Sequence, residues 1–340
     1  MQLALTIAAV VIAAICNYAG VGAVVTFVVS GAALALLART VGTATEQLGA
    51  RLGSGSASVI QSALGNLPEL FIALFALHKG LTNVVQAALV GSILANSVLV
   101  LGLAFIVGGL RNGPQQFSSE RARLVSTLTV LAAATLAIPS LAHAFHAPSE
   151  AHGEALSIVC AIVLLAVFCL TLPGFLRSAA GEEHTPARWS VAETATVLAA
   201  AGVGAAFASD WFVSALTPAI HTLHLSPEFA GLVIVAIAGN AVENVVGVQL
   251  AARNQPTFAI GVIVNSSLQV ALALTPVLVL VSLLFATHLT LVFPTLLALV
   301  LVLAGILGAL VVNDGQSTWE EGCVLVGFYV VIAASFWWGT

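Results

Sequence analysis

Two glutamates occupy matching motifs that are poorly suited to the middle of a membrane helix. The first motif reads GNLPEL over residues 65–70, and the second reads GNAVEN over residues 239–244. Both stand inside apolar runs, although Gly and Pro weaken or break helices and a carboxylate is costly in lipid. An ionisable residue within a membrane segment marks a candidate functional site. Glu69 and Glu243 are therefore the first residues to which we assign chemistry.

The surroundings of the two glutamates predict a site built from oxygen ligands. A helix break at each Gly-Asn pair exposes backbone carbonyls, which are tolerated at membrane depth only inside protein or along a polar cavity. Carbonyl, carboxylate and amide oxygens are the ligands that a hard cation such as Ca²⁺ prefers. Burial and mutual repulsion favour protonation of each carboxyl when the cation is absent. A site that holds either a divalent cation or protons is typical of an exchanger. The alternative is that the two glutamates only join helices by hydrogen bonds, and the symmetric pair favours the exchange site.

The motifs belong to a longer internal repeat, in which the second copy follows the first by 174 residues (65 to 239). The Gly, Asn and Glu of the motif recur at this offset, as do two further pairs, Ser92 with Ser266 and Lys79 with Arg253. Each copy is followed by a second interrupted apolar segment. Five predicted spans per half predict that the two halves cross the membrane in opposite directions, as an inverted repeat.

The composition predicts that most of the protein surface contacts a lipid bilayer. Apolar residue types make up 60% of the chain and charged types only 7%, with a mean hydropathy of +1.11. Soluble domains carry about 25% charged residues, so the expected fold class is an all-α polytopic membrane protein. The basic residues form no cluster that could neutralise phosphates, which excludes nucleic acid as a partner. The four cysteines lie in apolar stretches without CxxC spacing, and we expect buried thiols rather than disulfides or a metal site.

Apolar segments long enough to cross a membrane predict about 11 transmembrane helices. They cover residues 3–15, 21–37, 59–77, 84–110, 124–141, 155–176, 191–207, 229–250, 258–285, 289–312 and 324–338. This pattern divides the chain into an N-terminal helix (1–20), a first five-helix repeat (21–177), a cytoplasmic linker (178–188) and a second five-helix repeat (189–340), with broken helices at the GNxxE motifs.

The basic residues predict the orientation of these spans. If the loops alternate sides, all eight arginines fall on one side, and Lys79 falls on the other. Loops rich in Lys and Arg stay in the cytoplasm, so we expect a cytoplasmic N-terminus and an outer C-terminus. Seven of the eight histidines then lie on the outer side. The expected location is an inner or plasma membrane of bacterial type.

At the two motifs the chain resembles the cation/proton exchanger family of the Ca²⁺:cation antiporter superfamily. The resemblance rests on GNLPELFIALFALHKGLTNVVQAALVGSILANSVLVLG and GNAVENVVGVQLAARNQPTFAIGVIVNSSLQVALALTPVLVL, and extends through ATEQLGARLG, LTLVFP and VVNDGQSTWEEG. It implies ten core helices in two inverted repeats plus an extra N-terminal helix. It also implies exchange of Ca²⁺, or a related cation, for H⁺ by alternating access, without a cofactor.

The resemblance also implies a set of site residues. Glu69 and Glu243 would bind the cation and carry the protons. The other ligands that it implies are polar residues of the two motifs and of the segments that follow them, namely Asn66, Asn240, Ser92, Asn96, Ser266 and Gln269.

Several positions depart from the family pattern. Asn244 replaces the histidine of the second motif, and Asn265 replaces a glycine in the next segment. Two positions that are often acidic in the family appear as Thr43 and Asp210, and the acidic helix between the halves is reduced to two glutamates at 182–183. These departures bear on ion preference, affinity, pH dependence and regulation more than on the fold.

Three alternatives compete with a Ca²⁺/H⁺ antiporter. The first is a Na⁺-coupled exchanger, or one that carries a monovalent cation or another divalent one. The second is a membrane enzyme, but enzymes need a nucleophile or an open metal position near the acid, and the spans hold no HExxH or GxSxG motif. The third is a channel, which would favour rings from identical subunits over a repeat within one chain. The sequence favours the antiporter and makes no prediction of oligomeric state.

Overall fold

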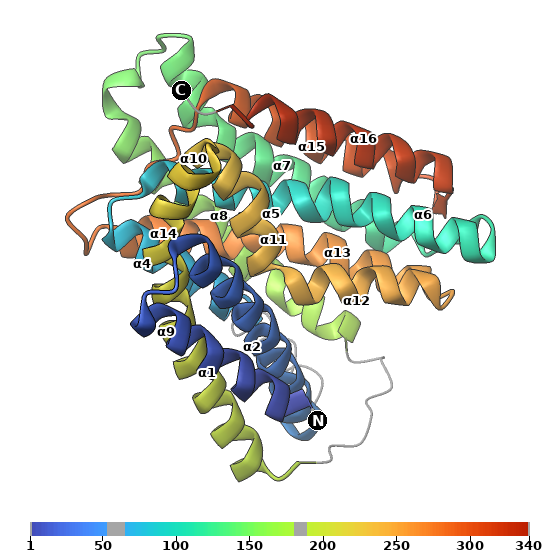
Figure 1. The fold of residues 1–340 in the computed structure, drawn as a ribbon. Helices are drawn as coiled ribbons and strands as arrows, with labels where there is room; N and C mark the ends of the chain where they lie inside the picture. Colours follow the sequence, from blue (N-terminus) through green and yellow to red (C-terminus); the bar gives the residue numbers. More distant parts are fainter. Residues whose placement is uncertain (1, 53–64, 180–188, 339–340) are drawn as a thin grey trace. The chain divides into compact units, whose positions relative to one another are not determined.

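The computed structural model describes residues 2–52, 65–179 and 189–338, and these segments are almost entirely helical (Figure 1). Contacts divide the chain into two compact units. Unit 1 comprises residues 1–79, 166–224 and 238–242, and unit 2 comprises residues 80–165, 225–237 and 243–340. Each unit therefore combines segments from both halves of the sequence.

Unit 1 is a helical bundle built around α2 (Ala23–Leu52) and α9 (Val191–Leu223), which pack along each other. The first helix, α1 (Gln2–Ala19), lies against α2, and the first motif helix, α4 (Leu67–His78), lies against α9. The C-terminal part of α8 (Gly153–Ala179) also belongs to this unit.

The contact between α2 and α9 is close because small residues face aromatic ones. The rings of Phe27 and Phe212 stack with their centroids 4.5 Å apart. A Cβ atom placed on Gly31 would lie 3.2 Å from the Phe212 ring. At the start of α9, Ser190 and Glu193 form a capping box, which satisfies free N–H groups of the first turn.

Unit 2 contains the remaining helices and one short pair of strands. Its first half holds α5 (Thr82–Leu94), η1 (Ala95–Val100), α6 (Leu101–Asn112), α7 (Ser119–Ala144), η2 (Glu150–His152) and the start of α8. Its second half holds α10 (Pro227–Phe229), η3 (Ala230–Val235), the beginning of α11 (Ala236–Gly239), most of α12 (Ala241–Ala252), α13 (Pro256–Gln269), η4 (Val270–Leu274), α14 (Thr275–Ser282), α15 (Thr295–Val311) and α16 (Trp319–Ser335). Strands β1 (Gln115–Gln116) and β2 (Gln316–Ser317) pair antiparallel. Within the unit, α15 packs on α7, α16 on α6, and α5 on η3.

Three segments of unit 2, η1, η3 and η4, are π-helical. A π-helical turn is wider than an α-helical turn, because each N–H bonds to the carbonyl five residues earlier, and such turns are frequent at functional sites. The η1 segment contains Asn96, and η4 begins directly after Gln269. The predicted spans 84–110 and 258–285 therefore correspond to the continuous helices Thr82–Asn112 and Pro256–Ser282, each of which contains a π-helical segment.

The segment between α14 and α15 forms neither helix nor strand. Its backbone at residues 289–293 hydrogen-bonds to side chains from four helices, namely Gln86 on α5, Ser140 on α7, Ser157 on α8 and Ser282 on α14. Buried backbone outside helices and strands needs other hydrogen-bond partners for its N–H and C=O groups. The four side chains provide these hydrogen-bond partners.

Within the described residues, six helices are long and apolar enough to cross a membrane, or seven if one bent pair counts as a single span. The bent pair is Pro227–Gly239 with Ala241–Ala252, which meet at 65°. These helices agree with a multi-pass membrane protein, and the count of 11 stays a prediction. Part of the third predicted span (59–64) and most of the linker (180–188) lie outside the described residues.

Two sequence-based expectations need correction. The helix expected to end at residue 207 continues to Leu223, because its polar Asp210 pairs with Lys79 and does not end the helix. The expectation of four buried thiols is also only half right, since Cys169 and Cys323 are exposed whereas Cys16 and Cys160 are buried. Lipid and protein interior are both apolar, so an apolar sequence context does not distinguish the two environments.

Candidate functional site

The two motif helices have the same length and the same relation to their motifs. Both α4 (Leu67–His78) and α12 (Ala241–Ala252) contain 12 residues, and their bounds differ by the motif offset. Each follows its Gly-Asn pair directly, so that the glutamate is the third residue of its helix. The free N–H groups of a first helical turn favour a negative charge. Glu69 and Glu243 therefore stand at helix N-termini. The second Gly-Asn pair lies at the bend between Pro227–Gly239 and Ala241–Ala252, whereas the residues that precede Gly65 lie outside the described part of the chain.

In unit 1, the glutamate of the first motif lies against the turn of the second motif. A Cβ atom placed on Gly239 would lie 3.4 Å from both Cβ and Cγ of Glu69. Glu69 is only 5% exposed, and the neighbouring Asn240 is 1% exposed. Asn66 is the N-cap residue of α4. Residues of both motifs thus share one buried polar region.

A carboxylate in such a place requires a counter-charge or a proton. Transfer of an ionised carboxylate from water to an apolar medium is very costly when nothing compensates its charge. A bound cation removes this cost by pairing with the carboxylate, and protonation removes it by neutralising the group. The position of Glu69 therefore suits a group that alternates between these two states.

In unit 2, the polar residues after each motif are hydrogen-bonded to one another. The Asn96 amide donates from Nδ2 to the Ser266 Oγ at 3.1 Å. Asn96 and Ser92 are fully buried, and Ser266 is 5% exposed. Gln269 is the last residue of α13 and is partly buried. The segments that follow the two motifs are thus joined at their polar positions.

A second hydroxyl pair lies beside this contact. The Ser97 Oγ donates to the Ser267 Oγ at 2.9 Å, and both residues are buried. Ser97 and Ser267 are not among the residues predicted from the sequence, although each directly follows a predicted site residue. The only feature of the sequence that could have indicated them is that they directly follow Asn96 and Ser266. Only the packing of η1 against α13 shows that they meet.

Glu243 lies on the face of α12 that packs within unit 2. Gly247 stands one helical turn later on the same face, and a Cβ atom placed there would lie 2.6 Å from Ile263 on α13 and 3.7 Å from Val100 on η1. Glu243 is therefore on the side of α12 that faces these two segments. Next to it, the buried Asn244 Oδ1 has no hydrogen-bond partner among the described residues.

The structure brings together part of the predicted site in each unit. Unit 1 contains Glu69 with the second-motif turn, and unit 2 contains Glu243 and the contact of Asn96 with Ser266. A joint role for the two glutamates stays a prediction that rests on the repeat. Among the described residues, no group of three or more His, Cys, Asp or Glu side chains could hold a resident metal ion.

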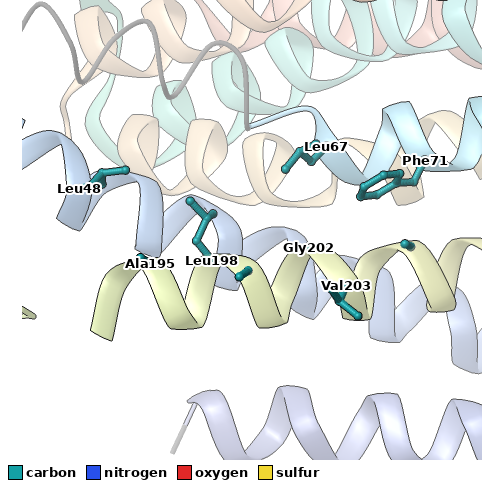
Figure 2. Close-up of a pocket in the computed structure, with 9 residues that line it drawn as sticks. Leu48, Leu67, Phe71, Ala195, Leu198, Gly202 and Val203 are labelled. Atoms are coloured by element: carbon teal, nitrogen blue, oxygen red, sulfur yellow. The ribbon is translucent and has the colours of Figure 1, made fainter. Parts of the chain in front are cut away.

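A separate pocket of about 520 Å³ in unit 1 does not match the predicted chemistry (Figure 2). Its lining comes from α2, α4 and α9 and is apolar, with Leu48, Leu67, Phe71, Ala195, Leu198, Ala199, Gly202, Val203 and Ala206. Leu67 and Phe71 stand two residues before and after Glu69, which places them on the opposite face of α4. The pocket therefore lies on the other side of this helix from the carboxylate.

Comparisons with known proteins agree in family and fold. The family model described as sodium/calcium exchanger protein matches residues 22–177 and 194–338. The chain is similar to the Ca²⁺/H⁺ antiporter ChaA of Bacillus subtilis (strain 168), with 35% identity over 321 residues that cover 92% of each chain. It is also similar to the structure of native YfkE, with 32% identity, a TM-score of 0.85 and coverage of 99% of each chain. The H⁺/Ca²⁺ exchanger CAX has the same fold, with a TM-score of 0.80 over 98% of this chain and 91% of the other at 15% identity.

Proposed function

Because the chain belongs to the sodium/calcium exchanger protein family, we propose that it is a secondary antiporter that exchanges Ca²⁺ for H⁺ across a membrane by alternating access. Family membership confirms the resemblance that the two motifs predict. It also identifies the protein as a multi-pass membrane transporter and not an enzyme. The observation that carries the proposal is the burial of Glu69 against the second-motif glycine.

Glu69 and Glu243 bind the transported cation in this proposal and accept protons when it leaves. Two carboxylates neutralise one divalent cation, and two protons neutralise the same carboxylates. An empty site with both carboxylates ionised would be very costly in an apolar environment. The site therefore changes its accessible side only when it holds the cation or protons, and this condition couples the two flows.

The remaining ligands are neutral oxygens from both halves of the chain. Ca²⁺ takes six to eight oxygen ligands, which two carboxylates alone do not provide. We assign the additional contacts to the polar residues of the motifs and of the segments that follow them, namely Asn66, Asn240, Ser92, Asn96, Ser266 and Gln269. The hydrogen bond between Asn96 and Ser266 supports their assignment to one group.

The two five-helix halves form an inverted repeat in this proposal, with the N-terminus in the cytoplasm of a bacterial-type cell. Helix bounds support the repeat, because α5 begins at Thr82 and α13 at Pro256, which again differ by the motif offset. Contacts between loops support the assignment of sides. Loops expected outside meet at Asn83 and Glu228, whereas loops expected inside meet at Arg123 and Asn313.

A Na⁺-coupled or monovalent cation exchanger is the second candidate. The observation that favours it is Asn244, whose buried amide oxygen adds a neutral ligand next to Glu243 where the resemblance implies a histidine. A site with less charge discriminates less between divalent and monovalent cations. The two candidates differ in which gradient drives transport.

Flux measurements on purified protein in liposomes separate these candidates. Liposomes with an acidic interior are diluted into alkaline buffer, and the uptake of each cation is followed one at a time. We expect Ca²⁺ uptake that stops when a protonophore collapses the pH gradient and that is absent from protein-free liposomes. Uptake driven by a Na⁺ gradient but not by a pH gradient would contradict the proposal and support the second candidate.

A further inference from the structure

Lys79 is the only lysine of the chain, and it stands at the end of the first motif helix. Its Nζ donates to the Ser214 Oγ and lies 3.4 Å from the Asp210 Oδ1. The Ser214 Oγ in turn donates to the Asp210 backbone carbonyl at 2.7 Å. The only ammonium group of the side chains is thus held by two polar residues of α9, one helical turn apart.

This contact lies at the opposite end of α4 from Glu69. The helix contains 12 residues, with Glu69 in its first turn and Lys79 as its C-cap residue. Apolar packing between α4 and α9 resists separation of the two helices more than sliding along their axes, because dispersion and hydrophobic contacts have little directionality. An ion pair with a hydrogen bond does have directionality, and it fixes the position of α4 along α9.

The end of α4 is also the point where the chain leaves unit 1. Lys79 is the last residue of the first segment of unit 1, and Gly80 begins unit 2 with a left-handed φ of 74°. A Gly in this conformation permits a sharp change in chain direction. The α9 contact therefore holds the helix at the residue before this turn.

The second motif helix is held in a different way. At the end of α12, Asn112 and Gln115 both donate to the Ala251 carbonyl, at 3.2 and 3.1 Å. Gln115 is 3% exposed and also donates to the Asn254 Oδ1 at 2.9 Å. Neutral amides, of which that of Gln115 is buried, thus anchor α12. A partly exposed charge pair anchors α4 instead, with side-chain exposures of 32% for Lys79 and 44% for Asp210.

We infer that Lys79 is a positioning residue for Glu69, which acts by anchoring the C-terminal end of α4 to Asp210 and Ser214 of α9. The inference rests on the proposed role of Glu69 in cation binding. Loss of the anchor lets α4 shift along α9 and moves Glu69 relative to Gly239 and Asn240. The consequence is weaker binding of the transported cation, with little effect on the folding of the bundle.

The test compares the KM for Ca²⁺ with the maximal rate in liposomes under an imposed pH gradient. Lys79→Met keeps the apolar stem and removes the charge, and we expect its KM to rise about two- to fivefold, which is the range available to an exposed ion pair. The apparent Tm should stay within about 2 °C of wild type. In Lys79→Glu combined with Asp210→Lys the pair is reversed, and KM should return toward the wild-type value.

Glu154→Gln is the matched control, because it removes another partly exposed pair, Glu154 with His288, that does not involve a motif helix. We expect its KM to match wild type. An unchanged KM in Lys79→Met, a failure of the charge reversal to restore KM, or an equal rise in the Glu154 control would each overturn the inference. If the wild type carries a different cation, the KM values of the same variants are compared for that cation. Failure of the Ca²⁺/H⁺ proposal is thereby distinguished from failure of the inference about Lys79.

A chemical measurement tests the contact independently of transport. A water-soluble amine-acylating reagent modifies only Lys79 among the side chains, and mass spectrometry of peptides separates it from the N-terminal amine. The Asp210 carboxylate and the Ser214 hydroxyl hold the Lys79 amine, so Asp210→Asn should release the amine and accelerate its acylation, whereas Glu154→Gln should not. Equal acylation rates in wild type and Asp210→Asn would overturn the anchor.

Discussion

The burial of Glu69 explains why its carboxyl group suits the proposed exchange of a cation for protons. Glu69 is 5% exposed and lies beside Gly239, where an added Cβ atom would be in van der Waals contact with the Glu69 side chain. A group in this position has to be neutralised by a cation or a proton. At the residue scale, the proposed exchange therefore rests on the cost of burying an ionised carboxylate. In the proposal, neutral oxygens from Asn and Ser side chains would complete the coordination.

Replacement of either motif glutamate by glutamine should abolish exchange without loss of the fold. Glutamine keeps the size and one oxygen of the side chain, but it can neither neutralise a cation nor take up a proton. We expect Ca²⁺ uptake by Glu69→Gln and by Glu243→Gln to fall to the level of protein-free liposomes. The apparent Tm should not fall, because a neutral amide costs less to bury than a carboxylate. Near-normal flux in either variant would show that its glutamate is structural.

The Asn244→His variant tests the residue that follows Glu243. Asparagine does not titrate, whereas an imidazole changes its charge near neutral pH. We expect the wild type to lack an imidazole step in its pH–flux curve and the variant to show a new inflection between about pH 6 and 7. The Ca²⁺ dependence measured against a competing monovalent cation should also change. An unaltered pH profile would place position 244 outside the transport pathway.

At the scale of elements, close approaches between helices depend on glycine. A Cβ atom placed on Gly91 of α5 would lie 2.2 Å from the Leu232 carbonyl oxygen, and one placed on Gly231 would lie 2.5 Å from the Val84 carbonyl oxygen. These two glycines allow α5 and η3 to pack backbone to backbone. The contact lies one residue before Ser92, so packing at the element scale also fixes a residue of the candidate site.

Gly91→Ala should therefore destabilise unit 2. The added methyl group cannot fit without moving η3, and overpacking of this kind costs about 1–3 kcal/mol. We expect a lower apparent Tm for the detergent-solubilised protein and reduced Ca²⁺ uptake. The control is Gly327→Ala on α16, where a Cβ atom meets no described atom within 4 Å and alanine favours the helix. Equal Tm values for the two variants would contradict this account of the packing.

For the whole molecule, the placement of charge supports the proposed orientation. All eight arginines fall on the side expected to be cytoplasmic, and Lys79 falls on the other. Loops expected on the same side contact each other within unit 2, as in the pairing of β1 with β2 and the hydrogen bond between His288 and Glu154. The local contacts and the charge bias therefore support the same arrangement of loops.

Accessibility labelling tests the orientation directly. In a variant whose four native cysteines are replaced by serine or alanine, His146→Cys should react with a membrane-impermeant maleimide in intact cells. Asn313→Cys should react only after permeabilisation, because it lies in a loop expected inside. The reverse pattern would show that the protein has the opposite orientation, and labelling of both sites in intact cells would contradict the predicted number of spans between them.

The sequence by itself determined the features that depend on local composition. The helix starts after Gly-Asn, the glutamates in the first helical turns and the alternation of apolar segments with charged loops are all properties of neighbouring residues. The motif repeat also identified the family, since the glutamates and their followers recur at a fixed offset. These features predicted the fold class and the candidate ligands.

Tertiary structure decided which distant residues meet. Asn96 and Ser266 are 170 positions apart, and Lys79 and Ser214 are 135 positions apart, so no local pattern specifies either contact. The sequence likewise did not predict that Cys169 and Cys323 are exposed. An apolar segment is compatible with lipid and with the protein interior equally. Side-chain packing decides such contacts because shape and hydrogen bonding distinguish the possible neighbours within a membrane, where hydrophobicity does not.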